Sequence, residues 1–189
     1  YVTILDGGKR TPAPWINVIA NPGFGFQVSA DGSGYTWAEN SRDNQLTPWS
    51  NDPVSDPAGE AIYVRDEENL DLWSPTAQPI RDGGGNVARH GFGYSRFEHE
   101  AKGVALDLLQ YVPLGDPIKI SRLTLRNVSG RARRLAVTTF AEWVLGTSRG
   151  TSGPFIITEV DAAAGAMLIR NPWGIDSSSR VAFADLSGR

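Results

Sequence analysis

Short apolar runs separated by turn sequences are the feature that most constrains the fold of this chain. Phe24–Ser29 places Phe24, Phe26 and Val28 on one face, and Asp31-Gly32-Ser33-Gly34 is typical of a tight hairpin turn leading into Tyr35–Ala38. Similar turn signals recur roughly every 8–12 residues, whereas no helical stretch of about ten residues stands out. The pattern therefore predicts an all-β sandwich or barrel.

The second half of the chain gives the clearest strand pattern. Residues 95–100 alternate polar with apolar side chains, which predicts an edge or half-exposed strand continuing from Val87–Tyr94. Further strands are expected over residues 104–109, 118–125, 134–145 and 181–184, with a hairpin formed by residues 155–160 and 166–171. Four arginines between Arg126 and Arg134 flank a turn, which favours a solvated rim over a phosphate site.

Length and composition exclude several classes of protein. The chain has 189 residues, a net charge of −3 and no cysteine, which predicts one domain, or one domain and part of another, without disulfides or thiolate metal sites. Its charge gives no sign of a nucleic-acid partner, and two histidines are too few for a multi-histidine metal centre. The first ten residues lack the pattern of a signal peptide, and no apolar run approaches the ~18 residues of a membrane span.

The stretch Tyr35–Asp66 contains the main candidate site. It leaves the aromatic pair Tyr35 and Trp37, crosses about two dozen residues rich in Asn, Asp, Ser, Pro and Gly, and returns to a strand-like run at Ala61–Val64. Tryptophan beside amide, carboxylate and guanidinium groups suits stacking on a sugar ring and hydrogen bonding to its hydroxyls. The candidate sugar-binding residues here are Trp37, Asn40, Arg42, Trp49, Asn51 and Asp52. The alternative is a long loop whose Trp49 fills the core beneath it.

A second candidate is the segment Arg89–Tyr94. Glycines on both sides of Phe92 allow close approach of the backbone, while His90 and Tyr94 supply a polar edge. The alternative is a β-bulge that carries a core aromatic residue. Trp15 is more typical of a core residue than of a sugar platform. The carboxylates Asp52, Asp56, Asp66 and Glu142 have no spacing that marks a catalytic pair.

The motifs, taken in order, resemble a known family. The series includes PAPWINVIANPGFGF, YTWAENSRDNQLTPWSNDPVSDPAGEAIYVRDEE, WSPT at residues 73–76, RHGFGY at residues 89–94, VPL at residues 112–114 and KISRLTLRNVSGRARRLAVTTFAEWVLG. It is similar to the N-terminal β-sandwich of glycoside hydrolase family 94, the cellobiose phosphorylase family, and most similar to that region of cyclic β-1,2-glucan synthases. The resemblance covers nearly the whole chain.

This resemblance implies an antiparallel β super-sandwich of the galactose-mutarotase-like type, here an incomplete fragment, that precedes an (α/α)6 barrel. The family's general acid and phosphate-binding residues lie mainly in that barrel, so no catalytic residue, metal or cofactor is expected here. Inorganic phosphate is expected only as a co-substrate of the parent enzyme. The family also implies an arginine that reaches a partner subunit's active site, and Arg149 lies in the corresponding region with a different spacing.

Three functional hypotheses follow. The first is an accessory sandwich, inactive alone, that supports the barrel of a bacterial glucan synthase or phosphorylase, contacts a β-glucan oligosaccharide and contributes to a homodimer. In this hypothesis the region is a soluble domain, the cytoplasmic part of an inner-membrane synthase or part of a soluble phosphorylase. The second is an autonomous carbohydrate-binding module, and the third is an oligomerisation platform.

Overall fold

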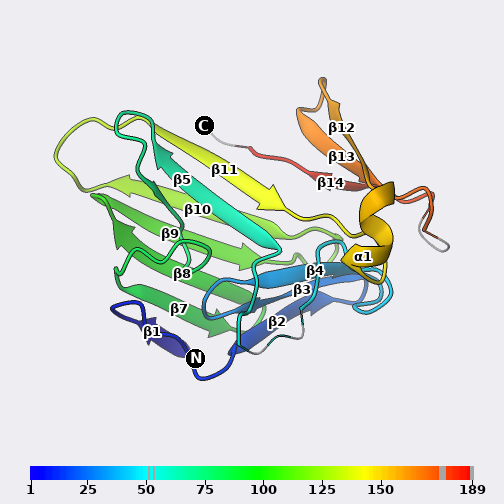
Figure 1. The fold of residues 1–189 in the computed structure, drawn as a ribbon, viewed down its shortest axis with the longest axis horizontal. Coiled ribbons are helices and arrows are strands. Elements are labelled where there is room, and N and C mark those ends of the chain that lie inside the picture. The colour runs from blue at the N-terminus through cyan, green and yellow to red at the C-terminus, as the bar shows by residue number, and fades with distance from the viewer. Residues whose placement is uncertain (51, 53, 175–177, 188–189) are drawn as a thin grey trace.

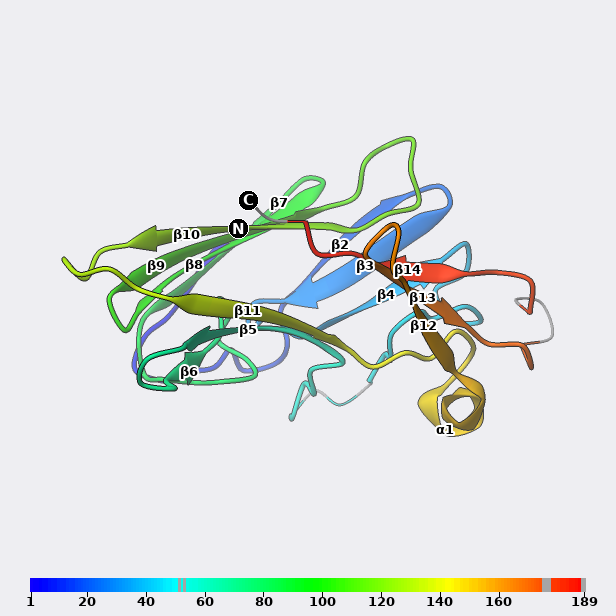
Figure 2. The ribbon, with the colours of Figure 1, turned by 90° about the horizontal axis from the view of Figure 1, so that it is seen from above.

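Antiparallel strands in two facing layers form the main body of the molecule (Figures 1 and 2). The computed structural model describes residues 1–50, 52, 54–174 and 178–187. One layer is a five-stranded sheet of order β1-β7-β8-β9-β10: β1 (Val2–Leu5), β7 (Asn86–Gly91), β8 (Tyr94–Ala101), β9 (Val104–Tyr111) and β10 (Ile120–Asn127). The facing layer has two three-stranded sheets. One has the order β2-β3-β4 and contains β2 (Ile16–Asn21), β3 (Phe24–Ser29) and β4 (Gly34–Ala38). The other has the order β11-β5-β6 and contains β5 (Glu60–Asp66), β6 (Leu72–Trp73) and β11 (Leu135–Ala141).

Two apolar clusters hold the layers together. In one, Phe26 and Val28 of β3 pack with Phe97 of β8 and Leu108 of β9. In the other, Trp73 of β6 packs with residues of β5 and β9. Every second residue of β8 and of β9 is buried in this core, which explains the alternation seen in that part of the sequence. The fold is therefore the antiparallel β-sandwich that the sequence predicts.

A fourth sheet projects from one end of this body (Figure 1). It contains β12 (Ile157–Asp161), β13 (Ala166–Arg170) and β14 (Ala182–Ala184). The helical segments among the described residues are the single turn α1 (Arg149–Ser152) and the 3₁₀ turn η1 (Gly153–Phe155), both between β11 and β12. No helix in the described part of the chain is long and apolar enough to cross a bilayer.

The local predictions are right at one hairpin and incomplete at another. The expected turn at 31–34 joins β3 to β4. Residues 87–100, however, form two strands, because the chain turns at Phe92-Gly93, where Gly93 adopts a φ of 77°. The prediction that residues 95–100 form an edge or half-exposed strand is half right. Strand β8 lies between β7 and β9, so it is not an edge, although one of its faces is partly exposed.

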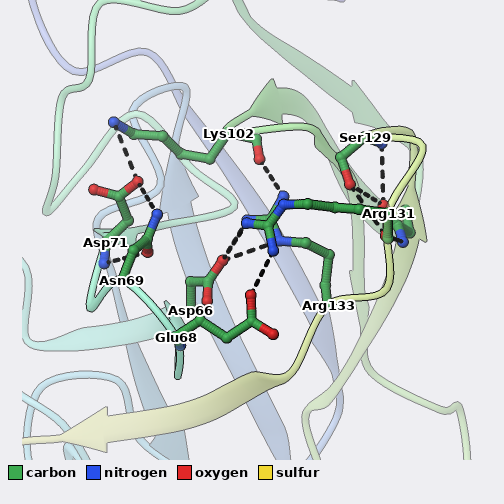
Figure 3. A network of polar contacts seen from close by, with 9 residues as sticks. Asp66, Glu68, Asn69, Asp71, Lys102, Ser129, Arg131 and Arg133 are labelled. Atoms are coloured by element: carbon green, nitrogen blue, oxygen red, sulfur yellow. Dashed lines mark hydrogen bonds and ion pairs between the residues drawn. The ribbon is translucent and has the colours of Figure 1, made fainter.

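The arginine-rich turn is only partly a solvated rim. Arg133 is nearly buried and donates to the Asp66 carboxylate from Nε (2.9 Å) and Nη2 (2.7 Å), as Figure 3 shows. The same guanidinium donates to the Lys102 carbonyl (2.6 Å), while Arg131 stays half exposed. Asp66 is fully buried. The rim prediction is therefore wrong for Arg133, which ties the start of β11 to the end of β5 and to the β8–β9 turn.

Candidate functional site

The long loop between β4 and β5 is fixed to the rest of the fold through Gln45. Its backbone forms isolated β-bridges with Trp37 and with Gly146. Its side-chain amide donates to the Thr147 carbonyl (3.2 Å), and its side-chain oxygen accepts from the Trp49 backbone N–H (3.0 Å). Residues 44–47 thus lie between β4 and the segment after β11, and this half of the loop is an ordered part of the sheet edge.

A buried carboxylate anchors the same loop from below. Glu60, at the start of β5, accepts hydrogen bonds from the hydroxyls of Thr36 (2.6 Å) and Thr47 and forms an ion pair with Lys119. Burial by itself raises the pKa of Glu60. The positive charge of Lys119, together with the hydrogen bonds from Lys119 and the two threonines, outweighs burial and holds this pKa below its ordinary value. Glu60 is therefore ionised at neutral pH and fixes the position of Thr47.

The aromatic residues of the site form a row on the outer face of β4 and the loop. The Tyr35 ring lies 5.2 Å from that of Trp37 and 6.3 Å from that of Trp49, measured between centroids. Trp37 lies across Gly25, where an added Cβ would come within 2.5 Å of its ring. Trp49 is 50% exposed, so it does not fill the core, and its indole is accessible to a ligand.

Two polar candidates have acceptor atoms engaged in local turns. The Asn40 side-chain oxygen accepts from the backbone N–H groups of Arg42 and Asp43, at 2.9 Å each. Asp52 accepts from the Ser55 hydroxyl and from the backbone N–H groups of Ser55 and Val54, and these bonds, in that order of weight, lower its pKa. Both residues shape the loop, which leaves less of their hydrogen-bonding capacity for a ligand.

The structure places Arg149 close to the base of this loop. It begins α1, after the Gly146–Thr147 segment that Gln45 binds, and pairs with Glu142 (Arg149 Nη2 to Glu142 Oε2, 2.9 Å). The Arg42 side chain is exposed and makes no hydrogen bond or ion pair with the described residues. The structure therefore brings Trp37, Asn40, Arg42, Trp49 and Arg149 together around the Gln45–Gly146 bridge. Asp52 lies farther along the loop, on the segment that Asp56 joins to Ser29 at the turn end of the β3–β4 hairpin. Asn51, also predicted here, lies outside the described residues.

The two candidates of the β7–β8 hairpin lie elsewhere. Asn17 of β2 donates to the carbonyls of Gly91 (3.0 Å) and Tyr94 (2.9 Å), which places this hairpin at the β2 edge, opposite β4. His90 faces the interior, is 9% exposed and bonds Ser95 Oγ through Nδ1 (2.8 Å). Burial lowers the pKa of His90. Tyr94 is 43% exposed on the other side of the sheet. The structure does not bring this pair to the loop.

Sequence reasoning missed the residues that position the loop. Gln45 and Thr47 belong to the loop itself, Glu60 begins β5 and Lys119 precedes β10, so these polar groups come from three separate segments. Lys119 also lies over the Phe26 ring, with Nζ 4.4 Å from the centroid. The one available signal was that Gln45 and Thr47 occur in a turn-rich stretch without being turn formers.

The remaining carboxylate candidates form ion pairs or hydrogen bonds within the fold. Asp66 is paired with Arg133, and Glu142 with Arg149. Asp56 accepts from the Ser29 hydroxyl (2.6 Å), and burial raises its pKa. Among the described residues, no group of three or more His, Cys, Asp or Glu side chains is placed to hold a metal ion.

Comparison with known proteins identifies the family. The family model described as "Glycosyl hydrolase 94, supersandwich domain" matches residues 1–189. The chain belongs to this family. A cyclic beta-(1,2)-glucan synthase, NdvB of Rhizobium meliloti (strain 1021), is 45% identical over 184 residues, which is 97% of this chain and 6% of that protein. The family assignment and the super-sandwich fold expected from the motifs are thus confirmed.

Phosphorylases of the same family are more distant relatives. An N,N'-diacetylchitobiose phosphorylase of Vibrio proteolyticus is 28% identical over 70% of this chain and 17% of its own length. A solabiose phosphorylase of Paenibacillus borealis is 29% identical over 73% of this chain and 18% of its own length. The chain therefore spans only a small part of each of these relatives, and it is homologous to both a glucan synthase and phosphorylases.

Proposed function

We propose that residues 1–189 form a non-catalytic, carbohydrate-associated β-sandwich of a glucan synthase or phosphorylase of the β-1,2-glucan type. In this proposal the domain supports an (α/α)6 catalytic barrel, forms one wall of its glucan site and contributes to dimer contacts. The observation that carries the proposal is the accessible Trp49 on a loop that Gln45 and Thr47 hold to the sheet, in a chain that is 45% identical to a cyclic beta-(1,2)-glucan synthase.

The geometry of the loop supports contact with a sugar. Trp49 offers an exposed indole face, and Arg42 offers exposed donors, on a segment held by Gln45 and Thr47. Aromatic rings stack on the apolar face of a pyranose, and guanidinium groups donate to its hydroxyls. Because residues 45–49 are already held by these bonds, little conformational entropy is lost when this part of the loop binds.

The surroundings of the carboxylates support a non-catalytic role. Glycosidic bond cleavage needs an acid with a raised pKa that reaches the leaving oxygen. At the loop, Glu60 is buried and held ionised by Lys119, and Asp52 has a lowered pKa. Asp56 has a raised pKa, but its carboxyl accepts a hydrogen bond from Ser29 at the end of β3. The acid and the binding residues for the inorganic phosphate co-substrate are assigned to the barrel.

Two assays test this proposal. Residues 1–189 incubated with β-1,2-glucan and inorganic phosphate are expected to release no glucose 1-phosphate, and clear turnover would contradict the non-catalytic role. In the complete gene product, Trp49→Ala and Arg42→Ala are expected to raise KM for glucan about fivefold, since each removes roughly 1 kcal/mol of contact. An unchanged KM in both variants would exclude the loop from the glucan site.

An autonomous carbohydrate-binding module is the second candidate, favoured by the exposure of Trp49. Such a module binds β-glucan without any barrel, and calorimetry on residues 1–189 separates the two functions. Millimolar affinity that falls when Trp49 is replaced by alanine would favour the module. If no heat of binding is detected at millimolar sugar, the module is excluded and the accessory role remains.

The cellular location is also part of the proposal. The relatives named above are bacterial, and we infer a bacterial source and a place on the cytoplasmic side of an inner-membrane synthase. Fractionation of cells that express the complete gene product, followed by protease treatment of spheroplasts, tests this location. Cleavage of this region in intact spheroplasts would contradict it.

A further inference from the structure

The outer face of the five-stranded sheet carries an ordered array of polar and aromatic side chains. Residues that pair directly across neighbouring strands share one face of a sheet. Because Phe97 and Leu108 form a pair that faces the core, the pairs on either side of it, Arg96–Leu109 and Glu98–Asp107, face outward. The next outward row is Glu100–Ala105–Arg126, and a row of Tyr94 and Tyr111 lies at the opposite end.

Ion pairs fix the middle of this array. Arg96 donates from Nε to both carboxylate oxygens of Asp107 (3.0 and 3.1 Å) and lies 3.4 Å from Glu98. Glu98 also accepts from Arg89 Nε (2.7 Å). The four side chains keep between 32% and 43% of their surface exposed. Their positions are thus set by one another, and each retains hydrogen-bonding capacity towards solvent.

This array borders an open hollow of about 450 Å³. Ala105 occupies the centre of a row between Glu100 and Arg126, and its short side chain leaves the space that the longer neighbours surround. The volume lies within the ~300–1,000 Å³ typical of small-ligand sites. Tyr94, farther along β8, packs against Gly91, where an added Cβ would lie 2.3 Å from the tyrosine ring.

The charges of the hollow select the class of ligand. Arg96 and Arg126 contribute two positive charges, and Glu98, Glu100 and Asp107 contribute three negative ones, a net charge of −1. An anion such as phosphate would be repelled by the three carboxylates. A metal cation would be repelled by Arg96, which already pairs with the carboxylates of Glu98 and Asp107. A protein partner fits poorly, because the centres of protein interfaces are depleted in charged residues. A neutral ligand with many hydroxyl groups fits both the donors and the acceptors.

We propose that this outer face, from Tyr94 and Tyr111 to the hollow around Ala105, is a second carbohydrate-binding surface that takes a β-glucan chain. The six-residue separation of Tyr94 and Glu100 on β8 gives a track of about 20 Å, long enough for several sugar units. The tyrosines stack on sugar rings, and the Arg96–Asp107 and Glu98 groups bond hydroxyls. The choice of β-glucan among polyhydroxylated ligands rests on the proposed function.

The test is equilibrium binding of a fluorescently labelled linear β-1,2-glucan oligosaccharide to the complete gene product. Tyr94→Ala and Asp107→Ala are each expected to weaken the affinity at least about fivefold, the effect of losing one stacking or charged hydrogen-bond contact. The matched control is Glu67→Gln, which removes the half-buried ion-pair partner of Arg65, a residue of β5, and is expected to leave the affinity unchanged.

The outcomes separate this surface from the loop. Weaker oligosaccharide binding in Tyr94→Ala and Asp107→Ala, with an unchanged KM for glucan at the catalytic site, supports the second surface. Binding that depends on Trp49 but not on Tyr94 or Asp107 overturns the second surface and leaves the proposed function intact. Equal weakening by Glu67→Gln would show a nonspecific charge effect and would also overturn it.

Discussion

Gln45 and Gly146 exchange two backbone hydrogen bonds, N–H to O at 2.9 Å and 3.1 Å in the two directions, across 101 positions of sequence. This pair joins the long loop after β4 to the segment after β11. Because Trp49 follows on one side and Arg149 on the other, the two candidate sugar contacts are fixed relative to each other by backbone bonds. Such bonds are expected to keep their geometry when surface side chains change.

The packing of Trp37 on Gly25 gives the first prediction. Gly25→Ala would place a Cβ 2.5 Å from the indole and 2.7 Å from Ala20 Cβ, so the ring must move off the sheet. We expect a loss of about 1–3 kcal/mol in the free energy of unfolding, the usual cost of overpacking, together with a shift in tryptophan fluorescence. Urea denaturation followed by fluorescence measures both.

Gly23→Ala is the matched control for that prediction. Nothing lies within 4 Å of the Cβ that alanine would add there, and the residue is two positions away in the same hairpin. We expect its stability to stay within about 0.5 kcal/mol of the wild type. Equal losses in both variants would mean that the effect arises from the glycine backbone and not from contact with Trp37.

The Glu60–Lys119 ion pair gives the second prediction. Both side chains are mostly buried, at 19% and 12% exposure, so Glu60→Gln leaves Lys119 without its charge partner. We expect a loss of about 3 kcal/mol in thermal or chemical unfolding. The double variant with Lys119→Met is expected to recover part of this loss. Glu68→Gln, at an exposed pair with Arg131, is the control and should cost less than about 1 kcal/mol.

Much of the fold could be predicted from the sequence because its signals are local. The alternation of Val104, Leu106 and Leu108 and the Asp-Gly turn at 31–32 depend on neighbouring residues only, and both are confirmed. The boundary inside 87–100 was missed because Phe92 is apolar, yet it lies at an exposed turn. Hydrophobicity alone predicts a continuing strand there.

The candidate site was less predictable because long-range contacts define it. The sequence indicated Trp49 and Arg42 from their residue types, and the structure places them on one loop. Nothing in the sequence indicated that Glu60 lies beneath Thr47. Nor did the sequence indicate that β3 separates the hairpin of His90 and Tyr94 from that loop. Sugar contact by these residues stays a prediction.

Asp56 gives a prediction for the pH dependence of stability. Burial raises its pKa, so the folded state binds more protons than the unfolded state between the ordinary value of 3.8 and the raised one. Stability contributed by this group is present at low pH and falls as pH rises through that window. Asp56→Asn removes the cost of the buried charge, and asparagine also tolerates the φ of 42° at this position.

We therefore expect Asp56→Asn to raise the melting temperature at pH 7 and to bring little gain near pH 3. Thermal unfolding of both proteins at these two pH values measures the difference. Asp43→Asn, an exposed carboxylate on the same loop, is the control and should change little at either pH. A gain for Asp56→Asn that is equal at both pH values would contradict the role assigned to burial of its charge.

The Thr47 hydroxyl gives the last prediction, which concerns the loop alone. This hydroxyl donates to Glu60 and accepts from the backbone N–H of Thr36 (2.8 Å), so the isosteric Thr47→Val leaves two buried groups short of a partner. We expect a loss of about 1–3 kcal/mol and faster proteolysis between residues 39 and 59, with the core strands unaffected. Limited proteolysis with mass spectrometry measures the cleavage sites. Thr151→Val, at an exposed hydroxyl on α1, is the control, and equal cleavage in both variants would exclude Thr47 as the anchor of the loop.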